Sequence, residues 1–108
     1  MVRRDKVEIF GPLTKIFSNS TAMILDQSLL VGSMQQSILM LSEVADLSYN
    51  TTEKVVKRLV SIGLMEYIGK IKNVRFFRFK MDNVYLHEIV QCAHKMQVER
   101  LREEVEAE

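Results

Sequence analysis

A helix pattern that ends at a glycine and is followed at once by two strand patterns constrains the fold of this chain most. Apolar residues recur at helical spacing between residues 50 and 62, at Val55, Val56, Leu59 and Ile62. Asn50 with Glu53 three residues later is a capping-box pattern, which opens a helix. Gly63 closes the pattern, because glycine adopts the left-handed conformation of a helix end most easily. The sequence therefore predicts a helix over residues 50–62.

The two strand patterns span residues 64–69 and 74–80. The second strand alternates apolar and basic side chains, and Lys70-Ile71-Lys72-Asn73 is the predicted turn between the strands. Side chains alternate across a strand, so we expect Phe77 and Phe79 to point to one face and Phe76 to the other. Packing of at least one of these faces against the core is the default expectation. The segment 64–80 is thus predicted to be a β-hairpin with a basic tip.

The sequence before residue 35 predicts two further helices. Pro12 is tolerated only in the first turn of a helix, so a helix starts near it or another ends before it. The apolar stretch around it contains Val7, Phe10, Leu13, Ile16 and Phe17. A capping cluster at 18–21 precedes a predicted helix over 22–30, which Gly32-Ser33 ends.

Residues 35–46 admit two interpretations. Residues 38–41 form a short strand in the first, followed by a helix that Ser42 caps. That helix would have about one turn, which is marginal for any helix. The second interpretation, which we favour, is a single helix over 35–46 that buries Ile38, Leu41 and Ala45.

A tight turn at Asp46 would join this helix to the helix over 50–62. Helices that cross closely need small or apolar residues at the contact. With the turn at Asp46, one such set faces inward or fills the turn: Leu41, Ser42, Ala45, Leu47, Thr52 and Val55. A register three residues later would bury Asn50 and Arg58, which is costly without partners.

The last predicted element is a long helix. Met81-Asp82-Asn83 breaks the second strand, and a helix follows over residues 84–107. Its apolar side carries Leu86, Ile89, Val90, Ala93, Met96, Leu101 and Val105. A domain this small leaves Leu101 and Val105 in water, and pairing of two copies would cover them. The alternative is a solvated tail, because Glu103 and Glu104 make this end strongly polar.

Charge is unevenly distributed along the 108 residues, which fit one small domain. Residues 50–80 hold 8 basic and 2 acidic residues, whereas the whole chain has a net charge of +1. Such a basic segment is typical of a protein with a polyanionic partner, although a merely solvated basic face is the alternative. We expect no membrane span and no secretory leader, and the single cysteine suits the reducing cytoplasm.

The segment from Leu47 to Met65, with the hairpin around Arg75-Phe76-Phe77-Arg78-Phe79, resembles MarR- and ArsR-type winged-helix regulators. The long helix after Met81-Asp82-Asn83 is similar to that of small archaeal-type regulators. The resemblance implies a mainly α-helical winged helix-turn-helix with a small β-hairpin wing. Residues 1–83 would be the DNA-binding part with an N-terminal helical extension, and residues 84–108 the dimerisation helix of the same domain.

By this resemblance, the chain is a homodimeric transcriptional repressor that binds double-stranded DNA. The helix 50–62 would enter the major groove, and the 64–80 hairpin would lie on the backbone or in the minor groove. Two features depart from the family pattern. Glu53 occupies a position where serine or threonine often faces DNA, so it either caps the helix or accepts a hydrogen bond from a cytosine amino group. The metal-binding cysteine pair of ArsR proteins is absent.

Hydroxyl, amide and cationic side chains suit phosphate oxygens and base edges. The DNA-binding candidates are Tyr49, Asn50, Thr51, Lys54, Lys57, Arg58, Lys70, Lys72, Asn73 and Arg75. The dimerisation candidates are Leu86, Ile89, Val90, Ala93, Leu101 and Val105.

Two other functions remain open from the sequence, namely a winged-helix adaptor for proteins and a DNA-binding structural or partition protein. We expect no enzymatic activity, because no nucleophile–base pair or phosphate-binding loop is present. His87, Cys92 and His94 lack further ligands at metal-binding spacing, so no metal or cofactor is expected. A small-molecule effector would have to bind at the dimer interface.

Overall fold

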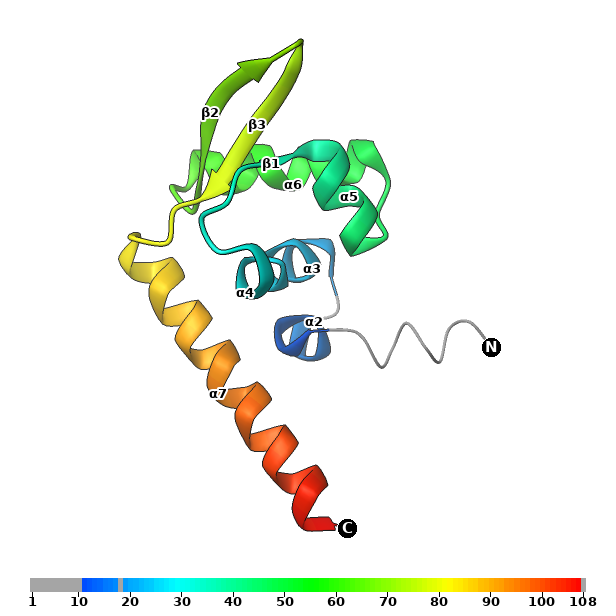
Figure 1. The fold of residues 1–108 in the computed structure, drawn as a ribbon, viewed down its shortest axis with the longest axis vertical. Helices are drawn as coiled ribbons and strands as arrows, with labels where there is room; N and C mark the ends of the chain where they lie inside the picture. The colour runs from blue at the N-terminus through cyan, green and yellow to red at the C-terminus, as the bar shows by residue number, and fades with distance from the viewer. Residues whose placement is uncertain (1–10, 18, 108) are drawn as a thin grey trace.

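The structure is a computed structural model and describes residues 11–17 and 19–107. Its elements, in chain order, are α2 (Pro12–Phe17), α3 (Ser20–Asp26), α4 (Ser28–Val31), β1 (Gln36–Ser37), α5 (Ile38–Ala45), α6 (Tyr49–Ser61), β2 (Met65–Ile71), β3 (Val74–Phe79) and α7 (Val84–Ala107). The strands form an antiparallel sheet in the order β1-β3-β2. The predicted mainly helical fold with a β-hairpin is confirmed (Figure 1). Val7 and Phe10 lie outside the described residues.

The main core lies where α3, α5, α6, the hairpin and the start of α7 meet. The buried face of α6 is formed by Thr52, Val55, Val56 and Leu59, which recur at helical spacing as predicted. Phe77 and Phe79 are buried on one face of the hairpin, whereas Phe76 on the other face is half-buried. The amphipathic pattern of α6 and the alternation in β3 are both confirmed.

The turn between α5 and α6 lies at Asp46, as predicted, and Asp46 adopts the left-handed conformation with φ 59°. The single helix over 35–46 is wrong at its start. Gln36 and Ser37 instead pair with Phe77 and Phe76 on β3. The Ser37 hydroxyl then accepts a hydrogen bond from the backbone N–H of Met40, so that the helix begins at Ile38. The strand interpretation was wrong as well, because residues 38–41 are helical.

Two other boundaries differ from the predictions. The helix expected over 22–30 is divided at Gln27, whose backbone N–H bonds to the carbonyls of Ile24 and Leu25 and closes α3. The hairpin turn is shorter than expected, because Lys70 and Ile71 belong to β2. Lys72 and Asn73 alone make the turn, with φ of 51° and 66°. Two left-handed residues in succession match the twist of a two-residue hairpin.

A buried carboxylate holds α2 on the domain. Asp26 accepts hydrogen bonds from the backbone N–H groups of Leu13 and Thr14, at 3.0 and 2.9 Å, and from the Thr14 hydroxyl at 2.6 Å. The first N–H groups of a helix have no partner within it, so Asp26 satisfies two of them from another helix. A Cβ atom on Gly11 would lie 2.4 Å from the Asp26 carboxyl carbon, which is why a glycine precedes α2.

One asparagine joins the end of α6 to the start of α7. The Asn83 side-chain amide donates to the Gly63 carbonyl at 3.0 Å. Its side-chain oxygen accepts from the backbone N–H groups of Tyr85 and Leu86, at 2.8 and 3.0 Å. From this joint α7 runs past α2 and away from the hairpin, so that the hairpin and the end of α7 lie at opposite ends of the molecule (Figure 1).

We expect Asp26→Ala to lower the free energy of unfolding by about 2 kcal/mol, because it leaves buried N–H groups of α2 without acceptors. Urea denaturation followed by circular dichroism measures the change. Glu88→Ala, at an exposed position on α7, is the control and should stay within about 0.5 kcal/mol of the wild type. Equal midpoints for the two variants would contradict the role of Asp26.

Candidate nucleic-acid interface

The exposed side of α6 is a polar and basic stripe. Successive residues of an α-helix are turned by about 100°, so positions four, seven and eleven residues apart share one side. Exposed side chains occupy these positions at Asn50, Lys54, Lys57 and Ser61. Arg58 is also exposed, beside the stripe. The side opposite the buried face of α6 therefore presents hydrogen-bonding and cationic groups to solvent.

The start of α6 differs from the prediction. The N-cap is Ser48, whose hydroxyl oxygen accepts from the backbone N–H of Thr51 at 3.1 Å and also bonds to the Thr51 hydroxyl at 3.0 Å. Asn50 lies inside the helix and Glu53 makes no capping contact, so the predicted capping box is wrong. In the sequence, Ser48 followed three residues later by Thr51 was the pattern that could have predicted this cap. The Asn50 side chain does not cap the helix and is exposed to solvent. Tyr49 beside it is 46% exposed.

Glu53 instead links α6 to the hairpin. The Arg75 Nη2 atom donates to Glu53 Oε2 at 2.6 Å, and the Lys57 Nζ atom lies 3.8 Å from the same oxygen. The hydrogen bond from Arg75 lowers the pKa of the Glu53 carboxyl, outweighing the partial desolvation that raises it, and Lys57 lowers it further. The pKa of the Arg75 guanidinium is raised, mainly by its hydrogen bond to Glu53 and further by the nearby Tyr49 hydroxyl. Glu53 and Arg75 are 22 residues apart in the chain, and their pairing was not predicted from the sequence.

The hairpin tip carries the other basic candidates. Lys70, Lys72 and Asn73 are all exposed. Further down the hairpin, Arg78 forms an ion pair with Glu66. Both acidic residues of the segment 50–80 are therefore paired with hairpin arginines. Lys54, Lys70 and Lys72 form no ion pair with any residue that the structure describes.

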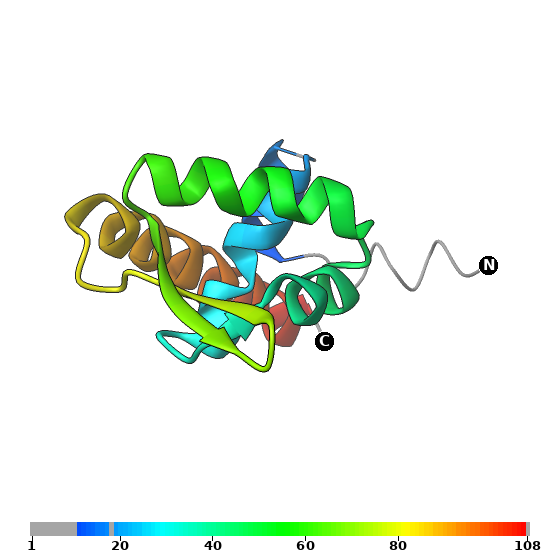
Figure 2. The same ribbon diagram turned by 90° about the horizontal axis from the view of Figure 1, so that it is seen from above.

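The hairpin and α6 lie on the same side of the molecule. Viewed from above, both face the reader, and α7 recedes behind them (Figure 2). The structure thus brings the ten DNA-binding candidates to two neighbouring elements, with Arg75 already engaged by Glu53. The dimerisation candidates are divided: Leu86 and Ala93 are buried in the chain's own core and are not available at a surface, whereas Leu101 and Val105 are 61% and 72% exposed.

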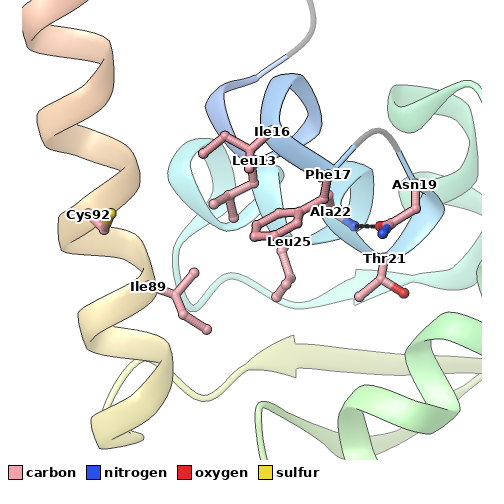
Figure 3. Close-up of a pocket in the computed structure, with 9 residues that line it drawn as sticks. All are labelled: Leu13, Ile16, Phe17, Asn19, Thr21, Ala22, Leu25, Ile89 and Cys92. Carbon is pink, nitrogen blue, oxygen red and sulfur yellow. Dashed lines mark hydrogen bonds between the residues drawn. The ribbon is translucent and has the colours of Figure 1, made fainter.

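An apolar pocket of about 380 Å³ lies between α2, α3 and α7, on another part of the molecule. It is lined by Leu13, Ile16, Phe17, Asn19, Thr21, Ala22, Leu25, Ile89 and Cys92 (Figure 3). The Asn19 side-chain oxygen caps α3 by accepting from the backbone N–H of Ala22 at 2.8 Å. The sequence analysis did not identify this pocket, because its walls come from segments about 70 residues apart.

The described part of the chain holds neither a metal-binding cluster nor a membrane-spanning helix. Over 11–17 and 19–107, no three His, Cys, Asp or Glu side chains lie close enough together to hold a metal ion. None of the helices in these ranges is long and apolar enough to cross a bilayer.

No family model and no curated protein sequence matches the chain, whereas several solved structures resemble it. A possible transcriptional regulator from Methanosarcina mazei Go1 is 16% identical, with a TM-score of 0.56 over 82% of this chain and 77% of the other. A predicted DNA-binding transcriptional regulator from E. coli is 20% identical, with a TM-score of 0.57 over 78% and 84%. A Staphylococcus aureus MarR in complex with salicylate and kanamycin is 18% identical, with a TM-score of 0.56 over 98% and 69%. At these identities the likeness concerns the fold alone, and it confirms the predicted winged helix-turn-helix fold.

We expect the contribution of the Glu53–Arg75 pair to stability to be lost in acid. A carboxyl whose pKa is lowered by folding stabilises the protein above its unfolded pKa, and this contribution disappears as the pH falls through the lowered value. Glu53→Gln should therefore be less stable than the wild type at neutral pH, and the difference should shrink as the pH falls below the ordinary pKa of a glutamate carboxyl. Urea midpoints across this range test it. Glu43→Gln, which removes an exposed carboxylate on α5, should show no such trend, and a similar trend in both variants would refute the expectation.

Proposed function

We propose that the protein is a DNA-binding transcriptional repressor that acts as a homodimer. The observation that carries the proposal is the exposed basic stripe of α6 beside the basic hairpin tip, on one side of a winged helix-turn-helix. Lysine and arginine neutralise phosphates, and this term supplies most of the affinity of such proteins for DNA. The solved structures of similar fold include proteins described as transcriptional regulators, which supports the same function.

In the proposed complex, α6 enters the major groove and the hairpin lies along the backbone or in the minor groove. Asn50, Lys54 and Lys57 project from the side of α6 that would face base edges and phosphates. Tyr49, Thr51 and the helix start suit phosphate oxygens. Lys70, Lys72 and Asn73 at the hairpin tip would contact the backbone. Arg58 lies beside the stripe and would meet a neighbouring phosphate.

The proposed dimer interface is the distal half of α7. Val98, Leu101 and Val105 are 40%, 61% and 72% exposed and follow one another at helical spacing. Among the residues that the structure describes, no other element covers the C-terminal end of α7, which extends beyond the body of the domain (Figure 1). Pairing with a second copy would cover it and give the two-fold symmetry of an inverted-repeat operator. Ile89 and Val90 are half-buried and would contribute only at the edge.

Repression would follow from occupancy, because a bound dimer covers an operator and excludes polymerase. The proposal places the protein in the cytoplasm with the DNA, and it assigns no enzymatic activity, metal or cofactor. One observation favours the alternative of a protein adaptor: Leu39, Met40 and Val44 of α5 are 55%, 41% and 60% exposed. An adaptor would use such an apolar face and would not need DNA.

The DNA-binding proposal predicts a salt-dependent affinity for duplex DNA. Fluorescence anisotropy of a labelled random-sequence duplex should give an affinity that falls with salt, with a logarithmic slope of about −0.9 for each neutralised phosphate. Lys54→Glu combined with Lys72→Glu should abolish binding at near-physiological salt. Lys15→Glu combined with Lys95→Glu makes the same charge change at exposed positions on α2 and α7 and should leave most of the affinity. If the wild type does not bind even at low salt, the adaptor becomes the preferred function.

If the protein is a dimer, substitutions in the α7 stripe of Val98, Leu101 and Val105 should lower its mass in solution from that of a dimer to that of a monomer. Analytical ultracentrifugation should find the wild type at twice the chain mass of 12.6 kDa. Leu101→Glu combined with Val105→Glu places charges in the proposed contact and should yield a monomer with unchanged helicity. Glu103→Lys, on the opposite side of the same helix, should remain dimeric. A monomeric wild type at concentrations well above those of the DNA titration would exclude the dimer.

A further inference from the structure

We propose that Glu53 is a positioning residue, which holds Arg75 and thereby fixes the hairpin at a set angle to α6 for DNA binding. This inference rests on the proposed function and deepens it. It removes Glu53 from the residues that read bases, and it moves Arg75 from the phosphate contacts to the framework of the interface.

The hairpin is anchored in the core at its base and as far as Phe77, which is 5% exposed and pairs with Gln36 of β1. Met65 and Phe79, which pair across its base, are 1% and 0% exposed. Ile71 and Val74, which pair next to the turn, are 53% and 44% exposed. A two-stranded ribbon without core packing is marginally stable in water. The outer half of the hairpin therefore needs another attachment if its orientation is to be fixed.

An irregularity separates the two halves. The pairing register shifts between Tyr67 and Gly69, where β2 carries one residue more than β3. Such bulges bend a strand and interrupt its hydrogen-bonded ladder. The Lys70–Arg75 pair lies beyond this point, on the side of the turn. Arg75 is thus placed where a single contact with α6 controls the part of the hairpin that the core does not hold.

The contact itself is short and directional. Arg75 Nη2 lies 2.6 Å from Glu53 Oε2, and Tyr49, one turn of α6 before Glu53, lies near the same guanidinium. Guanidinium–carboxylate hydrogen bonds are stronger than neutral ones and fix the geometry of both partners. A hollow of about 300 Å³ beside the contact is lined by Lys57, Val60, Tyr67, Arg75 and Phe77. Around this hollow, packing between α6 and the hairpin is incomplete, so the ion pair supplies the connection.

The same geometry argues against the two other roles of these residues. A glutamate that reads cytosine directs its carboxylate at a base edge, whereas Glu53 Oε2 accepts from Arg75 and lies 3.8 Å from Lys57 Nζ, and only 26% of the side chain is exposed. An arginine that holds a phosphate needs free donors directed at the backbone, whereas Arg75 is only one-third exposed and points to α6. Glu53 also neutralises the charge that Arg75 would offer to a phosphate.

Positioning has a specific consequence for binding. A hairpin already held in the bound orientation loses less conformational freedom when it meets DNA. Breaking the pair should weaken the affinity about five- to tenfold for all DNA sequences alike. The number of neutralised phosphates should not change, because the residues that contact them, such as Lys72, remain.

A double-mutant cycle on the full-length chain tests this role. Glu53→Gln, Arg75→Gln and the double variant are titrated with duplex DNA at several salt concentrations. Positioning predicts similar losses in all three variants, a double variant no weaker than either single one, and an unchanged salt slope. Lys72→Gln is the control for a true phosphate contact and should reduce the magnitude of the slope by about 0.9.

Three results would overturn the proposal. If Arg75→Gln reduces the magnitude of the salt slope by about 0.9, as expected for Lys72→Gln, Arg75 is a phosphate contact. A preference changed at one base pair by Glu53→Gln would make Glu53 a base reader. Tighter binding by Glu53→Gln would mean that the carboxylate only repels DNA.

A measurement without DNA separates this inference from the proposed function. Backbone ¹⁵N relaxation of the free protein should give lower order parameters at Lys72 and Asn73 in Glu53→Gln and in Arg75→Gln than in the wild type. Unchanged order parameters would refute the positioning role even if the wild type binds DNA. Lower order parameters in a protein that binds no DNA would refute the proposed function and leave the mechanical link intact.

Discussion

The buried crossing of α5 and α6 determines the position of everything that we assign to function. Ser42 and Ala45 allow the helices to approach, and Thr52 is fully buried between them. A threonine is suitable there because its hydroxyl donates to the Ser48 carbonyl at 2.9 Å, so no polar atom is left without a partner. With this crossing fixed, the opposite side of α6 must face solvent. The basic stripe is therefore exposed because the core face is defined, and not because the sequence is rich in lysine.

Charge within residues 50–80 is used in two different ways. Each glutamate pairs with a hairpin arginine: Glu53 with Arg75, which joins the hairpin to α6, and Glu66 with Arg78, which joins the two strands. Lys54, Lys70 and Lys72 form no ion pair with any described residue and stay available to a partner. This division agrees with the chemistry of the side chains, because arginine makes directional contacts with carboxylates and lysine is a flexible point charge. A net charge of +6 alone would not distinguish the two groups.

Most of the fold could be predicted from the sequence because its main signals are local. Helical spacing at Val55, Val56 and Leu59, a glycine stop at Gly63 and alternation in β3 are all properties of neighbouring residues. The errors arose where a distant segment intervenes. Gln36 and Ser37 became a strand because an edge of β3 was available, and Asp26 caps a helix 12 residues earlier in the chain. The candidate site followed the same rule: its exposed lysines were predictable, and the partner of Glu53 was not.

The joint at Asn83 connects the two surfaces that the proposed function requires. Its side chain bonds to the carbonyl of Gly63, two residues after α6, and caps the first turn of α7, so this one amide links the two helices and helps to fix the angle between them. The sequence analysis treated Asn83 only as a strand breaker. If α7 pairs with a second copy, the separation of the two α6 helices is set by this angle together with the length of helix between Asn83 and the exposed stripe. Both are rigid features of the fold, which means that the spacing of operator half-sites would be determined by the protein before it meets DNA.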